Sequence, residues 1–223
     1  MSMMRLLRSG IGTKILVAVT GLGLVGFLAS HVAGNMNIFL PPRKGQPAIE
    51  AYADQLHHIP GFIFIELGLV AMFVGHIMLT LMLVLQNRQA KGSRYAVQAT
   101  KQQRSGNLAS RTMAISGIIV LVFLVVHVSD FRLQRELITN SGGLEANLLE
   151  KLAVPWRAAL YVVGSILISF HMTHGIASAF RSFGLAHEKY TPIIEKAGYT
   201  LGIVIGLGFA SIPIYALIRG GAS

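Results

Sequence analysis

The main feature of the chain is five long runs of apolar residues separated by polar segments. None of these runs alternates apolar and polar residues with a period of two, and all are too long for strands. A helix rises about 1.5 Å per residue, so each run is long enough to cross a hydrocarbon layer of about 30 Å. The pattern predicts membrane-spanning helices at approximately residues 14–39, 61–85, 112–131, 156–180 and 199–218.

The composition agrees with this pattern. Of 223 residues, 53% are hydrophobic and only 13% are charged, too few to cover so much apolar surface in a soluble domain. We therefore expect an all-α integral membrane protein forming one domain over residues 1–223, with a four-helix bundle plus a fifth helix. The chain has no cysteine, which excludes disulfides, thiol chemistry and iron–sulfur clusters held by its own residues. The first run is too long for a signal peptide and lacks a clear cleavage site.

Lysine and arginine are distributed unevenly between the polar segments. One alternating set of segments holds 12 of the 19, and the other set holds 7. The positive-inside rule then predicts a cytoplasmic N-terminus and an external C-terminus. The net charge of +10 is thus a sign of topology and not of nucleic-acid binding.

Two shorter patterns predict details of the fold. Apolar residues recur at helical spacing within residues 41–60, which indicates a short helix on the outer membrane surface. In the last run, Gly198, Gly202 and Gly206 form a ridge of small residues that predicts close packing against a neighbouring helix.

The candidate chemistry lies in His31, His76, His127 and His171, one in each of the first four runs. A single histidine inside a span is as well explained by packing and a hydrogen bond as by function. Four in successive spans indicate a shared role, because ionisable side chains are costly in lipid.

The depths of these histidines pair them. His31 and His127 lie 17 and 16 residues into helices that start at the predicted cytoplasmic face. Both therefore lie about 24–26 Å up, toward the outside. His76 and His171 each lie 16 residues into helices that start outside, and so reach a similar depth toward the cytoplasm. Two histidines at one level on facing helices are what a six-coordinate haem iron requires, so the sequence predicts two stacked haems.

Metal sites without haem and proton pathways fit these histidines less well. Zinc or copper sites gather three or four ligands at one level, whereas the four histidines divide between two levels. A proton or ion pathway would use several acidic residues, and the spans contain essentially only Glu66. His174, three residues after His171, is an alternative ligand, but its depth of 19 residues does not match the other three. We expect it to bond a propionate or a quinone instead.

With these residues in hand, the chain resembles the single-subunit, di-haem cytochrome b anchor of bacterial succinate dehydrogenase and fumarate reductase. The similarity covers nearly the whole chain. The runs that carry it are KILVAVTGLGLVGFLASHVAGNMNIF, IELGLVAMFVGH, SRTMAISGIIVLVFLVVHVSDF and FHMTHGIASAFRSFGLAHEKYTP. The first has the family's Thr-Gly, then His, then Gly-Asn pattern, and the family's four axial ligands match the four histidines named above.

The resemblance implies a function. Electrons would pass from an iron–sulfur subunit through two b haems to a membrane quinone, expected to be menaquinone. The partners would be that subunit and a flavoprotein with covalently bound FAD. Both would lie on the cytoplasmic face of the bacterial inner membrane. The resemblance also allows a higher oligomer of the complex. This chain would have no succinate site of its own. The alternatives are the anchor of a fumarate reductase, that of another quinone-linked dehydrogenase, or a haem-free transporter or scaffold.

Quinone reduction consumes protons, so a quinone pocket needs polar groups beside an apolar slot. Candidates for quinone or propionate binding are His174, Arg88, Arg111, Arg181 and Ser182 on the inner side, and Glu66, His58, His57, Asn35 and Arg132 on the outer side. Headgroup anchoring explains each arginine equally well when it is taken singly. Some fumarate-reducing relatives carry a glutamate at the position of Ser169 that helps to move protons across the membrane, and this chain lacks that glutamate.

Overall fold

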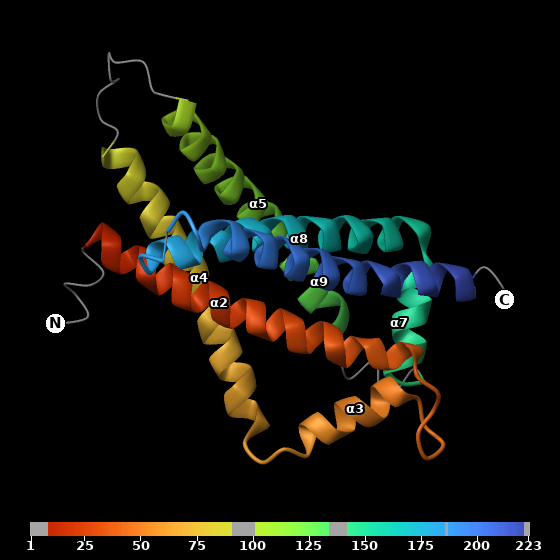
Figure 1. Ribbon diagram of the computed structural model, residues 1–223. Coiled ribbons are helices and arrows are strands. Elements are labelled where there is room, and N and C mark those ends of the chain that lie inside the picture. The colour runs from red at the N-terminus through yellow and green to blue at the C-terminus, as the bar shows by residue number, and fades with distance from the viewer. Residues whose placement is uncertain (1–8, 91–100, 134–141, 186, 221–223) are drawn as a thin grey trace.

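The computed structural model describes residues 9–90, 101–133, 142–185 and 187–220, with side chains described outside 88–90 and 101–111. This part of the chain folds into long and short helices (Figure 1). They are α2 (Gly10–Asn35), the 3-10 turn η1 (Met36–Phe39), α3 (Ala48–His57), α4 (Phe62–Ala90), α5 (Lys101–Phe131), α7 (Leu144–Ala153), α8 (Pro155–Ser182) and α9 (Thr191–Gly220).

Five helices in the described part are long and apolar enough to cross a membrane, as the sequence predicts: α2 with η1, α4, α5, α8 and α9. The helices extend beyond some predicted runs. α5 begins at Lys101 and α9 at Thr191, ahead of the apolar stretches that start near residues 112 and 199. Backbone hydrogen bonding continues a helix into polar sequence, whereas the apolar run marks only the part suited to lipid.

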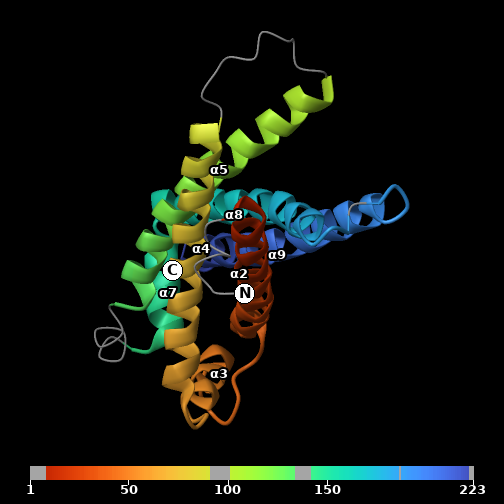
Figure 2. The same ribbon diagram turned by 90° about the vertical axis from the view of Figure 1, so that its left-hand side faces the viewer.

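Helix α8 is the centre of the packing. It contacts α2, α5 and α9, while α4 packs against α2. In both views α8 and α9 lie side by side, and α4 and α5 are tilted away from them (Figures 1 and 2). The bundle thus contains two hairpin-like halves: the first is α2 with α4, and the second is α5 with α8.

The glycine ridge on α9 explains how closely α8 and α9 approach. A Cβ atom added to Gly202 would lie 2.8 Å from Thr173 Cγ2, and one added to Gly206 would lie 2.7 Å from Ser169 Cβ. Ser169 also donates a 2.7 Å hydrogen bond to the Gly202 carbonyl. The predicted role of the ridge in packing is therefore confirmed, and Ser169 faces α9.

The short helices α3 and α7 cover one end of the bundle. The short helix expected within residues 41–60 is present as α3, whereas α7 was not expected from the sequence. A cluster of buried side chains joins both to the long helices: Ile38, Ile49, Leu148, Leu152, Tyr161, Ile212 and Ala216. A carboxylate oxygen of Glu50, on α3, accepts a hydrogen bond of 3.3 Å from the backbone N–H of Glu145 in the first turn of α7. A carboxylate there stabilises the positive end of the helix dipole.

Candidate functional site

His31 and His127 come from different halves of the bundle and meet in space. They are called the outer pair, and His76 and His171 the inner pair, after the sides predicted from the sequence. Their ring centroids lie 5.8 Å apart, with the ring planes at 85°. His31 is on α2 and His127 on α5. Counting residues along the two helices predicts this proximity, and the structure contains it.

Aromatic side chains surround the outer pair. One helical turn before each histidine, a phenylalanine stacks on the imidazole: Phe27 on His31 at 5.2 Å and Phe123 on His127 at 6.1 Å between centroids. Phe209 of α9 approaches His31, and Tyr161 of α8 approaches His127. The outer imidazoles therefore lie mainly among aromatic rings, and the side-chain amide of Asn35 is a polar neighbour, 3.5 Å from His31 Nε2.

The inner pair, His76 on α4 and His171 on α8, has a different setting. The Nδ1 atom of His76 lies 3.1 Å from the hydroxyl oxygen of Thr20, on α2. The Nδ1 atom of His171 lies 3.0 Å from the hydroxyl oxygen of Ser116, on α5. Each inner histidine is thus hydrogen-bonded to a hydroxyl from its own half of the bundle.

The hydrogen bonds of Thr20 and Ser116 are compatible with a proton on Nδ1 of each inner imidazole. The Thr20 hydroxyl donates to its own helix, to the carbonyl of Leu16 at 2.9 Å, and the Ser116 hydroxyl donates to Met113 at 3.2 Å. Each hydroxyl oxygen can therefore accept a hydrogen bond from an imidazole that carries its proton on Nδ1. The lone pair of a neutral imidazole then remains on Nε2, where it can bind a metal ion.

A glycine follows each of these hydroxyl residues and makes room for the imidazole. A Cβ atom on Gly21 would lie 3.2 Å from His76 Cε1, and one on Gly117 would lie 3.3 Å from His171 Cε1. Such contacts are tighter than ordinary van der Waals packing. Glycine therefore lets each inner ring lie directly against the neighbouring helix.

These matching contacts reflect an internal repeat that the pattern of apolar runs did not predict. Residues 18–32 and 114–128 share the pattern Ala, aliphatic, Thr or Ser, Gly, five residues, Phe-Leu, two residues, His-Val. The repeat has an offset of 96 residues, and the inner histidines are 95 residues apart. Each half contributes one outer histidine, one inner histidine and one hydroxyl, which is the arrangement of a parallel repeat related by an axis along the membrane normal. Comparing the first and third runs would have identified Thr20 and Ser116.

A second group that the sequence did not single out lies beside His127. Asp130 accepts a 3.0 Å bond from Arg157 and a 2.9 Å bond from the Tyr161 hydroxyl, and Lys151 Nζ lies 3.9 Å from the same carboxylate. The side chain of Asp130 is 13% exposed and that of Lys151 is 16% exposed. Two cations face one carboxylate here, so the cluster carries a net positive charge at the outer level.

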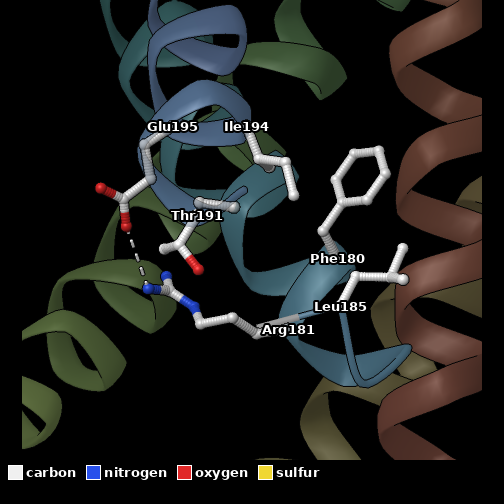
Figure 3. Close-up of a pocket in the computed structure, with 7 residues that line it drawn as sticks. Phe180, Arg181, Leu185, Thr191, Ile194 and Glu195 are labelled. Atoms are coloured by element: carbon white, nitrogen blue, oxygen red, sulfur yellow. Dashed lines mark hydrogen bonds and ion pairs between the residues drawn. The ribbon is translucent and has the colours of Figure 1, made fainter. Parts of the chain in front are cut away.

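The inner polar candidates lie at the far end of α8. Arg181 forms an ion pair of 3.3 Å with Glu195 of α9, beside a cavity of about 10 Å³ between the two helices (Figure 3). That volume holds about one water molecule. Ser182 donates to the Ser178 carbonyl, and His174 Nδ1 lies 3.0 Å from the Phe170 carbonyl. The described side chains therefore show no preformed slot for a quinone head at this position.

The outer polar candidates form other contacts. Glu66 pairs with Arg132 at 3.1 Å across α4 and the end of α5. His57 packs against the ring of Phe62, and His58 Nδ1 lies 2.7 Å from the Asp54 carbonyl. Asn35 donates to the carbonyl of His31 at 2.8 Å.

The side chains of Arg88 and Arg111 lie outside the described part of the structure, so their proposed roles stay predictions. Within the described residues, no three or more His, Asp or Glu side chains form a group that could hold a metal ion. A bis-imidazole pair supplies only two protein ligands and so is not such a group.

Comparison with known proteins adds no relative: no family model, no curated protein and no solved structure matches this chain. Function is therefore inferred from the geometry above and from the sequence resemblance.

Proposed function

We propose that this chain is the cytochrome b membrane anchor of a succinate dehydrogenase, passing electrons from an iron–sulfur subunit through two b haems to a membrane quinone. The observation that carries the proposal is that His31 and His127 meet from the two halves of the bundle, while His76 and His171 contact hydroxyls at equivalent positions of the internal repeat. Packing alone does not explain why histidine, an ionisable residue that is costly within a membrane, recurs in this symmetric arrangement.

The residues suit a haem at each level. At the outer level, the imidazoles of His31 and His127 meet with their ring centroids 5.8 Å apart, so both could bind one haem iron. At the inner level, a proton on Nδ1 would leave Nε2 of His76 and His171 available as ligands.

The two levels are well separated. Thr20 marks the inner level on α2 and lies 11 residues before His31, as Ser116 lies 11 before His127 on α5. Eleven residues of helix correspond to about 16 Å. That spacing suits two separate cofactors, one above the other, held between the same four helices.

Charged side chains near the outer pair would complete its site. Arg157 and Lys151 carry one more positive charge than Asp130 neutralises, beside His127. Such a half-buried excess of positive charge would hold the propionate carboxylates of a haem. At the inner level, Arg181, with Arg88 and Arg111, is the corresponding candidate.

The haem supplies the one-electron chemistry when bound. The chain's own residues hold the two haem levels apart, exclude water with aromatic side chains at the outer level, and fix the imidazoles by hydroxyls at the inner level. The choice of succinate and quinone as reaction partners, the flavoprotein and iron–sulfur subunits, and the bacterial inner membrane come from the sequence resemblance.

The test is purification of the protein from membranes with whatever subunits accompany it, followed by reduced-minus-oxidised spectroscopy and haem quantification. We expect two low-spin b haems per chain, both reducible by succinate. His76→Ala should remove or convert only the inner haem, and exposed His187→Ala should leave both. Absence of haem from the wild-type protein, or unchanged haem content in His76→Ala, would refute the assignment. Haems that are reduced by another substrate but not by succinate would point to a different dehydrogenase.

A further inference from the structure

The inner histidines share a contact that the outer histidines lack. Thr20 and Ser116 occupy equivalent positions of the internal repeat, one residue before the glycines that accommodate the inner rings. Both hydroxyls lie close to Nδ1 of an inner imidazole, at 3.1 and 3.0 Å. The outer imidazoles are held instead by stacked phenylalanines.

The direction of these bonds follows from the proposed ligand role. An imidazole that binds iron through Nε2 carries its remaining proton on Nδ1. Each hydroxyl has a carbonyl of its own helix within reach as an acceptor for its proton, so its oxygen can accept the Nδ1–H bond. Ser116 is itself buried, with 4% of its surface exposed, so water does not compete for its bond to His171.

We propose that Thr20 and Ser116 are positioning residues that fix the orientation and raise the basicity of the two inner haem ligands, and so set the potential of the inner haem alone. This inference rests on the proposed function. A hydrogen bond from Nδ1–H to an oxygen fixes the tautomer and ring rotation of a ligating imidazole and makes it a stronger donor. A stronger donor favours the oxidised, more positive iron, so each hydroxyl lowers the inner potential.

The repeat makes the inference specific, because two hydroxyls act on two ligands of the same iron. Removing either should raise the inner potential, and removing both should raise it further. Since Thr20 and His31 lie about 16 Å apart along α2, neither change reaches the outer ligands.

The experiment uses the complex purified from membranes. Thr20→Val and Ser116→Ala remove the hydroxyls with little change in shape, while Thr20→Ser and Ser116→Thr keep them. Thr200→Val and Ser211→Ala are matched controls, because these α9 hydroxyls bond only to carbonyls of their own helix in the described structure. Redox titration gives the midpoint potential of each haem, and electron paramagnetic resonance of the oxidised protein reports the imidazole orientations.

We expect Thr20→Val and Ser116→Ala to raise the inner midpoint potential and move its low-spin signal, with the outer haem unchanged. The hydroxyl-keeping variants and the α9 controls should match the wild type. Loss of the inner haem from Thr20→Val, with retention in Thr20→Ser, would also support the role. Unmoved potentials and signals in both hydroxyl-free variants, or equal shifts at both haems, would overturn this inference while leaving the two-haem assignment intact. A wild-type protein without haem would refute the proposed function itself.

Discussion

The Tyr161 hydroxyl of α8 donates a hydrogen bond of 2.9 Å to Asp130, three residues after His127 on α5. The same carboxylate pairs with Arg157 at 3.0 Å, so it joins two spans at the level of the outer pair. Asp130→Asn should therefore destabilise the protein by about 1–3 kcal/mol, because a charged hydrogen-bonding partner of a half-buried cation is lost. Tyr161→Phe should cost about 0.5–1.5 kcal/mol. Unfolding of the purified protein in denaturing detergent measures both changes.

The matched control for that cluster is Arg132→Gln. It breaks the ion pair with Glu66, which also joins two spans, but the arginine side chain is 54% exposed. Exposed pairs contribute about 0–1 kcal/mol. The Asp130 substitution should also weaken retention of the outer haem before the inner one. Equal stability of Asp130→Asn and Arg132→Gln would show that burial of the cluster has no energetic effect.

A second prediction concerns Gly164 of α8, which faces the ring that stacks on His127. A Cβ atom at Gly164 would overlap the ring of Phe123. Gly164→Ala should force that ring away from His127 at a cost of about 1–3 kcal/mol, and should perturb the spectrum of the outer haem. Gly68→Ala on α4 is the control, because no atom lies within 4 Å of the added Cβ and alanine favours helix by up to about 1 kcal/mol. Gly164→Ala with wild-type stability and an unchanged outer haem would contradict the prediction.

The spans were predictable from the sequence because apolar length is a local property, and the lipid requirement makes it strong. The proximity of His31 to His127 was predictable as well, because residue counts along straight helices give depth. The contacts of Thr20, Ser116 and Asp130 were not predicted, since they depend on helix rotation, which a count does not give. Helix α7 was also missed: it is short and half polar, and it is held by packing against α3, α8 and α9.

A third prediction is that His174 is not an axial ligand. Its Nδ1 lies near the Phe170 carbonyl, one turn back on its own helix, and no described hydroxyl from a neighbouring helix reaches it. His174→Gln should therefore keep both low-spin haem spectra while lowering turnover with quinone. Spectra of the purified variant check this. Loss of the inner haem in His174→Gln but not in His171→Ala would transfer the ligand role to His174.

Membrane sidedness gives a fourth prediction. The bias of lysine and arginine predicts that the loop before α3 faces outside and that the turn between α8 and α9 faces the cytoplasm. The natural chain has no cysteine, so Gln46→Cys and Glu188→Cys each introduce a unique thiol at an aqueous loop. An impermeant maleimide added to sealed cells should label only the first. Labelling of both, or of Glu188→Cys alone, would contradict the predicted topology.

The last prediction addresses the quinone. An inner site would need no electron transfer across the membrane, whereas an outer site would move charge through a potential worth about 2.3 kcal/mol per charge per 100 mV. We therefore expect quinone near His174 and Arg181. In the structure, Arg181 pairs directly with Glu195 beside a cavity of only about 10 Å³ (Figure 3). Quinone would have to displace this ion pair to gain room.

Two single substitutions separate the roles of Arg181. Arg181→Gln and Glu195→Gln both break the ion pair, so a purely structural role would give the same turnover in both. If the guanidinium contacts quinone or a propionate, only Arg181→Gln lowers succinate–quinone turnover, and Glu195→Gln keeps or raises it by freeing the arginine. Both variants keep the haem ligands, so haem content controls for assembly. A quinone analogue that photo-crosslinks only beside His31, Glu66 and His127 would place the site at the outer level instead. Electrons would then have to pass through both haems to reach it.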